Sequence, residues 1–154
     1  LNVMVAKLKG AKVIATDINE YRLNKAKEFG ADQIINAKEK LDFKADRIIV
    51  CTGAYSAIEQ AFRCIDNKGT ILLFAIPNKN IEIPTVDFWR NEITITSSYG
   101  AAGDDLPEAL ELIRNKQINV KALITHVLPL AEIQKGFKLV AEAQNSLKVV
   151  LTPQ

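Results

Sequence analysis

Apolar residues follow two different spacings along this chain. Continuous apolar runs such as Ile48–Cys51 and Ile71–Ile76 are typical of strands that are buried on both faces. Between such runs, apolar residues recur three or four positions apart, as at Leu23, Ala26 and Phe29, which is the spacing of a helix with one buried face. The pattern therefore predicts strands that alternate with helices.

The predicted elements can be given in chain order. The predicted helices cover residues 1–8, 19–29, 54–65, a segment that begins at 104–105, and 130–143, with a helical turn at 85–90. The predicted strands cover residues 12–16, 33–36, 46–51, 70–75, 92–97, 123–127 and 147–151. Strands and helices that alternate at these lengths are joined by right-handed crossovers. We therefore predict an α/β fold with a doubly wound parallel sheet of the Rossmann type.

Composition indicates an ordinary globular chain. The 154 residues suit a single domain with one packed core, and a hydrophobic fraction of 48% with a charged fraction of 25% excludes disorder. The 20 Lys and Arg residues are interspersed with 18 Asp and Glu residues and form no basic stripe. We therefore expect neither nucleic acid nor an anionic membrane surface as a partner.

The apolar runs are far shorter than the ~20 residues that a bilayer-spanning helix needs. No signal-peptide pattern opens the chain, so we expect a cytoplasmic protein without a membrane segment. Cys51 and Cys64 lack the paired spacing of a zinc site, and we interpret them as reduced core thiols. Because the sequence starts at Leu1 without an initiator Met, we interpret it as a fragment or a trimmed chain.

Asp17 carries the clearest chemistry in the chain. It ends the apolar run Val13–Thr16, and Arg22 follows five positions later. A carboxylate at the carboxyl end of a parallel strand binds the adenosine ribose hydroxyls in dinucleotide-binding folds and repels a 2′-phosphate. The position therefore predicts NAD as the cofactor in preference to NADP. Such an Asp follows a Gly-x-Gly-x-x-Gly turn by about 20 residues, so we expect the first strand and this turn to be missing before Leu1.

Each of these signals also has a structural alternative. Asp17 could serve only as a carboxylate at a helix N-terminus, and Arg22 could be a solvated charge. Gly53 could be required only for a tight strand-to-helix turn at positive φ. The segment Gly100–Gly103 resembles a phosphate loop, but we reject it because the two aspartates that follow would repel a pyrophosphate.

Two further residues are interpreted as structural. His126, the single histidine, has no acid–base partner among its neighbours in the sequence. Trp89 and the adjacent Phe88 are expected to pack under a loop or at a subunit contact.

Four short motifs occur in a specific order along nearly the whole chain. They are Gly10–Ile14 leading to Asp17, Lys25–Asp32, Cys51–Gly53, and a closing segment with Ile124–His126, Leu130, Glu132, Ile133, Gly136 and Phe137. Together they resemble the medium-chain dehydrogenase/reductases, in the branch of the zinc-dependent alcohol, polyol and threonine dehydrogenases. The resemblance implies that residues 1–154 form one NAD(P)-binding Rossmann-type domain, truncated at its N-terminus.

The resemblance also assigns candidate cofactor-binding residues. These are Asp17 and Arg22 at the adenosine, Thr52 and Gly53 along the cofactor cleft, and Phe74, Ala75 and Ile76 near the nicotinamide end. The family's zinc ligands and substrate pocket lie in a separate catalytic domain that this chain lacks, so we expect no catalytic and no metal-binding residue here. The strand Glu92–Ser97 is similar to the edge through which the family's subunits form homodimers.

The implied activity is that of an NAD-dependent oxidoreductase. It would transfer hydride between a small alcohol or polyol and NAD, with zinc assistance in the intact protein. The fragment alone would be inactive. Two alternatives remain, a zinc-free member similar to quinone reductases and a module that only binds nucleotide or dimerises.

A missing first strand has a consequence for the sheet. The usual strand order 3-2-1-4-5-6 places that strand in the middle. Its loss would leave two unpaired edges. We expect one of three arrangements: a preceding segment fills the gap, the strands that begin at Lys12 and Asp46 pair directly, or a neighbouring chain supplies a strand.

Overall fold

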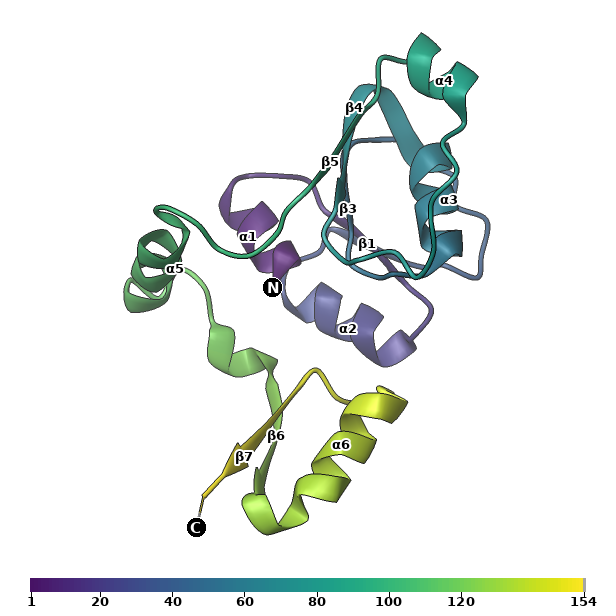
Figure 1. Cartoon of the computed structure of the whole chain (residues 1–154). Helices are drawn as coiled ribbons and strands as arrows, with labels where there is room; N and C mark the ends of the chain where they lie inside the picture. Colours follow the sequence, from purple (N-terminus) through teal and green to yellow (C-terminus); the bar gives the residue numbers. More distant parts are fainter. Residues whose placement is uncertain (154) are drawn as a thin grey trace. The chain divides into compact units, whose positions relative to one another are not determined.

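The computed structural model describes residues 1–153 (Figure 1). It divides into two compact units. Unit 1 comprises Leu1–Glu39 and the segment from Ala102 onward, and unit 2 comprises Lys40–Ala101. Among the described residues the strands form three sheets, and every strand pair is parallel. Parallel strands that alternate with helices confirm the predicted α/β, Rossmann-type fold.

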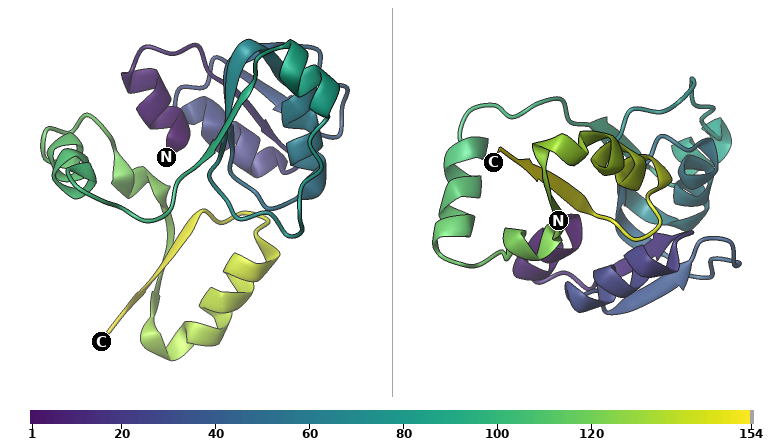
Figure 2. Two further views of the ribbon diagram at one scale, coloured as in Figure 1. Left: turned by 45° about the horizontal axis from the view of Figure 1, so that its top comes forward. Right: turned by 90° about the horizontal axis from the view of Figure 1, so that it is seen from below.

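The elements run along the chain from α1 to β7, as the colours in Figure 1 and Figure 2 show. Unit 1 contains α1 (Asn2–Leu8), β1 (Ile14–Asp17), α2 (Glu20–Glu28), β2 (Gln33–Asn36), α5 (Asp105–Arg114), η1 (Val120–Leu123), β6 (Ile124–Pro129), η2 (Leu130–Glu132), α6 (Ile133–Glu142) and β7 (Lys148–Thr152). Unit 2 contains β3 (Ala45–Val50), α3 (Tyr55–Cys64), β4 (Ile65–Leu73), α4 (Thr85–Arg90) and β5 (Thr94–Ser97). Within unit 1, β1 pairs with β2 and β6 with β7, whereas unit 2 has the order β3-β4-β5.

The start of β4 differs most from the predicted boundaries. We expected the strand to begin at Thr70, but it begins at Ile65, because Ile65 already pairs with Ala45 before the register shifts. Lys68 has a φ of 59°, which marks the irregularity. Gly69 permits the tight path, since a Cβ there would lie 2.5 Å from the Ile65 side chain. The regular ladder to β3 and β5 then starts at Thr70.

The clustered hydrophobic core belongs to unit 2. Val50, Ile58, Ala61, Ile65, Ile71 and Ile93 form this cluster, in which α3 covers the sheet. Phe62 packs against the cluster and is partly buried. Unit 1 buries Leu23, Ala31 and Ile118 outside that cluster. Each unit therefore buries apolar residues of its own.

In unit 1 the motif Gly30-Ala31-Asp32 connects α1, α2 and β1. Gly30 has a φ of 101°, and a Cβ there would lie 3.3 Å from the Lys7 side chain. The Asp32 carboxylate accepts hydrogen bonds from the Val13 N–H (2.6 Å) and from the Lys7 ammonium (2.9 Å). The pKa of Asp32 lies below its usual range. The hydrogen bond from the Val13 N–H is the larger cause, and the hydrogen bond from the Lys7 ammonium is the second. These contacts explain why a glycine stands at position 30 and an aspartate at position 32.

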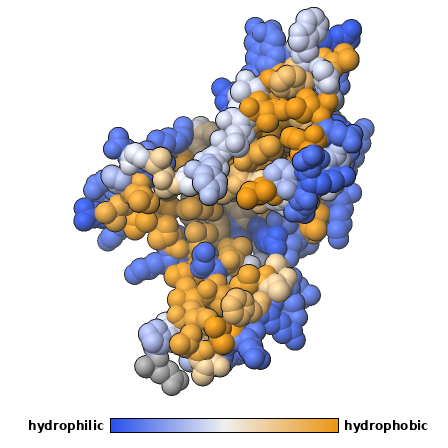
Figure 3. Space-filling model, in the orientation of Figure 1, coloured by the Kyte–Doolittle hydropathy of each residue, from blue (hydrophilic) through white to orange (hydrophobic). Residues whose placement is uncertain are grey.

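Unit 1 also exposes apolar side chains. Figure 3 shows them gathered over the segment of β6, β7 and α6. The exposed members on these elements are Ile124, Val127, Ile133, Phe137 and Val140. On α5, the apolar side chains of Leu106, Leu110 and Ile113 are also exposed. Among residues 1–153, no helix is both long enough and apolar enough to cross a membrane.

Two packing expectations are corrected by the structure. Cys64 is buried, as expected for a core thiol, and burial raises its pKa, but Cys51 is exposed just after the end of β3. The side chain of Phe88 packs against the core cluster, whereas Trp89 is 77% exposed. Trp89 therefore does not pack under a loop of its own unit, because α4 directs only the neighbouring ring inward.

Direct pairing of β1 with β3 is not what the structure shows. The ladder partner of β1 is β2, and the ladder partner of β3 is β4. The two strands belong to different sheets in the part of the chain that the structure describes.

The Asp32 contacts predict a pH-dependent contribution to stability. A carboxylate with a lowered folded-state pKa stabilises the fold fully above its unfolded-state pKa of about 3.9, and this contribution is lost as the pH falls through the lower folded value. We expect Asp32→Asn to destabilise the chain at neutral pH and the two proteins to converge in strong acid. Urea unfolding across this range measures the difference. Asp42→Asn, at an exposed loop position, is the control with unchanged stability at neutral pH, and a difference for Asp32→Asn that stays constant with pH would contradict the prediction.

Candidate functional site

Asp17 ends β1, and its partner in the parallel ladder is Asn36 at the end of β2. The two side chains therefore share the carboxyl edge of this sheet, where open α/β sheets bind their ligands. One carboxylate oxygen of Asp17 accepts the Asn19 N–H at 2.9 Å, and the other lies 3.5 Å from the Arg22 guanidinium. The Asp17 side chain is 28% exposed. Because the contact with Arg22 is long, the carboxylate keeps acceptor capacity for a ligand.

Asn19 caps α2 and fixes the surroundings of Asp17. Its side-chain oxygen accepts the Arg22 N–H at 3.1 Å, which is the usual N-cap contact. Its amide nitrogen donates to the carbonyls of Ala143 and Gln144, both at 3.0 Å. The capping role therefore belongs to Asn19 and not to Asp17. Sequence reasoning missed this residue, although an Asn directly before a helical segment is a recognised start signal.

A second missed pair lies at the end of β2. The Asn36 amide donates a hydrogen bond to the Glu20 carboxylate, and its oxygen accepts the Lys38 N–H at 3.0 Å. The Asp17 carbonyl accepts the Ala37 N–H at 2.9 Å. The side chains of Asp17, Glu20 and Asn36 thus form a polar rim at the edge where β1 and β2 end. The sequence did offer a signal for Asn36, because it is the polar residue that directly follows the apolar Ile34 and Ile35 of the short strand.

In unit 2, Thr52 and Gly53 follow the end of β3. The Thr52 hydroxyl accepts the Ala54 N–H at 3.3 Å and so shapes the turn into α3. Gly53 is absent from the described residues with positive φ, so the explanation by a left-handed turn is wrong. Its need for glycine comes from close approach, because a Cβ would lie 2.5 Å from the Ile76 carbonyl oxygen and 2.6 Å from the Asn78 side chain.

Phe74, Ala75 and Ile76 follow the end of β4. The N–H groups of Phe74 and Ala75 both donate to the Val50 carbonyl, at 3.0 and 3.2 Å, so the chain leaves the sheet beside the end of β3. The side chains of Phe74 and Ile76 are 55% and 85% exposed. Unit 2 therefore presents an apolar surface next to the Thr52–Gly53 turn.

The structure brings the predicted site residues together in two groups. Asp17 and Arg22 contact each other in unit 1, and Gly53 meets the segment from Phe74 to Ile76 in unit 2. Sequence reasoning missed two residues that stabilise the second group. The Asn78 N–H donates to the Gly53 carbonyl at 3.0 Å, and the Lys79 ammonium lies 3.8 Å from the centre of the Tyr55 ring.

His126 has a structural setting, as the sequence indicated. Its Nδ1 lies 3.0 Å from the Thr125 hydroxyl, which accepts the Leu147 N–H and donates to the Lys148 carbonyl. These contacts connect β6 with β7. Among residues 1–153, no three His, Cys, Asp or Glu side chains form a group that could hold a metal ion.

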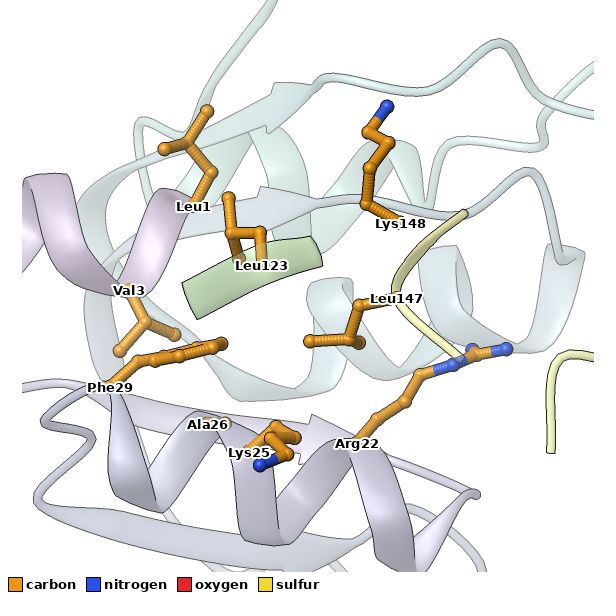
Figure 4. A pocket seen from close by; sticks show the side chains of 9 residues that line it. All are labelled: Leu1, Val3, Arg22, Lys25, Ala26, Phe29, Leu123, Leu147 and Lys148. Atoms are coloured by element: carbon orange, nitrogen blue, oxygen red, sulfur yellow. The ribbon is translucent and has the colours of Figure 1, made fainter. Parts of the chain in front are cut away.

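Unit 1 also contains a shallow pocket of about 300 Å³ (Figure 4). Apolar side chains such as Phe29, Leu123 and Leu147 point into it, while the charged ends of Arg22 and Lys148 point away. Lys25, at its border, is paired with Glu28 at 2.6 Å. Most of the lining is therefore apolar, and Arg22 is the one predicted cofactor-binding residue among the residues that line the pocket.

The comparisons with known proteins identify the family. The family model described as zinc-binding dehydrogenase matches residues 1–115. The chain belongs to the zinc-binding dehydrogenase family. Alcohol dehydrogenase 1 of Zea mays is 33% identical over 156 residues, which cover 90% of this chain and 41% of that protein. The chain therefore spans less than half the length of this relative.

Solved structures of other dehydrogenases have the same fold. A short chain alcohol dehydrogenase from Escherichia coli, complexed with NADH, has a TM-score of 0.85 and 26% identity, and the match covers 97% of this chain and 48% of that one. A zinc-binding dehydrogenase from Sinorhizobium meliloti, bound to NADP, has a TM-score of 0.87 and 20% identity, with 98% and 48% covered. The first of these structures holds NADH and the second holds NADP.

The Asn19 contacts predict a loss of stability on substitution. Asn19→Ala removes the N-cap of α2 and the two hydrogen bonds to the carbonyls that follow α6, at an expected cost of about 1–2 kcal/mol. Urea unfolding followed by circular dichroism measures this difference. Asn24→Ala, at an exposed position within α2, is the matched control and should leave stability unchanged or slightly raised. Equal stability of Asn19→Ala and the unmodified chain would contradict the role assigned to the cap.

Proposed function

We propose that this chain is the nucleotide-binding domain of an oxidoreductase that transfers hydride between an alcohol or polyol and NAD. Family membership and the alcohol dehydrogenases among its relatives support the reaction class. The observation that carries the choice of cofactor is the partly exposed Asp17 carboxylate at the carboxyl end of β1. Its position fits a group that accepts hydrogen bonds from both hydroxyls of the adenosine ribose.

The same carboxylate disfavours NADP. A 2′-phosphate would bring close to two negative charges next to Asp17, and like charges at this distance repel. The nearby cation cannot offset this repulsion fully, because Arg22 is already directed at Asp17 and donates to the Ala143 carbonyl at 3.3 Å. We therefore assign Arg22 to the edge of the adenosine, where it supports Asp17.

The second group of residues fits the nicotinamide half of the cofactor. Gly53 packs directly against the Ile76 carbonyl, so the Thr52–Gly53 turn and the segment from Phe74 to Ile76 form one continuous surface. The exposed Phe74 and Ile76 offer an apolar surface for a planar ring, and the backbone of Ala75 lies between them. We propose that Thr52 and Gly53 line the cofactor cleft and that Phe74, Ala75 and Ile76 lie near the nicotinamide.

In the proposed reaction, the chemistry would come from NAD and zinc and not from the side chains of residues 1–154. Bound NAD accepts or donates the hydride. We propose that the zinc from which the family takes its name is held by a catalytic domain outside residues 1–154, where it would polarise the substrate oxygen. The exposed apolar residues Val127, Phe137 and Val140 support a contact with a further part of the protein.

We further propose a cytoplasmic homodimer that joins through the edge strand β5. In unit 2, β5 pairs with β4 on one side and lies at the edge of its sheet. The exposed Val86 and Trp89 of α4 precede it in the chain, and large exposed apolar residues of this kind are typical of subunit contacts. This supports the subunit-contact interpretation of Trp89.

The decisive experiment exchanges the carboxylate at position 17. In the whole enzyme we expect Asp17→Ser to lower kcat/KM for NAD by about tenfold and to raise it for NADP, because repulsion disappears and Arg22 becomes available for the 2′-phosphate. Steady-state kinetics with both cofactors measure the ratio. Glu28→Gln, which removes an exposed carboxylate from the far end of α2, is the matched control and should leave the ratio unchanged. An unchanged ratio of kcat/KM for NAD and NADP in Asp17→Ser would contradict the proposal.

A second prediction concerns residues 1–154 expressed alone. The sequence contains no Gly-x-Gly-x-x-Gly turn, which supplies the main pyrophosphate contacts in this type of fold. We therefore expect no alcohol oxidation and weak or undetectable NAD binding. Calorimetric titration with NAD measures the binding, and micromolar affinity would contradict the expectation.

A further inference from the structure

The segment that follows β4, residues 74–79, is held at both ends by unit 2, and we call it the β4 loop. At its start, the N–H groups of Phe74 and Ala75 share the Val50 carbonyl. Near its end, the Asn78 N–H donates to the Gly53 carbonyl at 3.0 Å. Pro77 restricts the residue before it to extended conformations. The exposed Ile76 is thus carried by a short loop with two backbone anchors.

A third contact lies at the end of the β4 loop. The Lys79 ammonium is 3.8 Å from the centre of the Tyr55 ring, well within the range of a cation–π interaction. Tyr55 is the first residue of α3 and is half-buried, so the ring is fixed by the helix. Lys79 is exposed, and a long exposed side chain keeps such a position only when a contact favours it. The lysine therefore connects the loop to the beginning of α3.

The geometry points to Lys79 as a positioning residue for the nicotinamide end of the cofactor, a role that rests on the function proposed above. By contacting Tyr55, it keeps the β4 loop against the Thr52–Gly53 turn. The backbone of Ala75 and Ile76 is then already in place when the cofactor arrives. Lys79 itself need not touch the cofactor.

The cost of ordering a loop on binding predicts how loss of the Lys79–Tyr55 contact changes the affinity for the cofactor. A loop that is loose in the free protein must be ordered on binding, and this lowers the affinity for whatever contacts the loop. Loss of the Lys79–Tyr55 contact should therefore weaken binding of the nicotinamide half alone. The adenosine half binds at Asp17 in unit 1, where neither residue of the pair lies.

The test compares two ligands in the whole enzyme. NADH contains both halves of the cofactor, whereas ADP-ribose lacks the nicotinamide. In Lys79→Met, which removes the charge and keeps the length of the chain, we expect the affinity for NADH to fall about three- to tenfold and that for ADP-ribose to stay unchanged. Lys79→Arg, which retains the cation, should restore NADH binding. Fluorescence titration of NADH and calorimetry with ADP-ribose measure the two affinities.

Matched variants make the outcome specific. Tyr55→Phe keeps the ring and should bind NADH normally, whereas Tyr55→Leu should behave like Lys79→Met without a further loss in the double variant. Lys40→Met removes an exposed lysine elsewhere in unit 2 and is the neutral control. Normal NADH affinity in Lys79→Met, or a parallel loss of ADP-ribose binding, would overturn the role of Lys79. Failure of the unmodified enzyme to bind either ligand would instead overturn the proposed function.

Discussion

Parallel pairing of short strands is the constraint on which the candidate site depends. In a parallel ladder all strands run the same way, so the residues that end them lie at one edge. The register of β1 and β2 sets Asp17 beside Asn36, and the register of β3 and β4 sets Val50 beside Leu73. Each pair then delivers a different chemistry to its edge, a polar rim in unit 1 and an apolar loop in unit 2.

The polar rim shows how a backbone arrangement sets the state of one charged side chain. Asp17 has one oxygen engaged by the Asn19 N–H and a looser contact to Arg22, so its charge is held in place without being buried. A more tightly paired or more deeply buried carboxylate would have less acceptor capacity for two ribose hydroxyls. Asn19 supports this state indirectly, because it caps α2 and so fixes the position of Arg22 in the first turn of that helix.

The fold was predictable from periodicity, because strand and helix spacings differ and glycines end the helices. Gly10 and Gly30 illustrate this, since each follows a helix and has a positive φ. Asp17 was predictable as the polar residue that ends a buried strand. The reason for Gly53 was not, because a close approach between Gly53 and Ile76 depends on how two loops pack and leaves no periodic signal. The same applies to the Lys79–Tyr55 contact and to the exposure of Trp89, which depend on tertiary packing.

Family membership follows from the order of the motifs, yet each motif turned out to have a local physical task. In Lys25–Asp32, for example, Ala31 is buried and Asp32 accepts the Val13 N–H, so both residues serve the fold. Such residues identify relatives without describing their chemistry. The cofactor preference that we propose depends instead on a few residues at strand ends.

The carbonyl of Ala143 receives hydrogen bonds from both Asn19 and Arg22, across a sequence separation of 121 residues in the case of Arg22. Contacts between such distant segments form late, because closing a long loop is entropically unfavourable until other structure has brought the ends together. During synthesis on a ribosome, the chain must therefore extend beyond Ala143 before the start of α2 acquires its final surroundings. Until then β1 and α2 can form while the guanidinium beside Asp17 still lacks its distant acceptor.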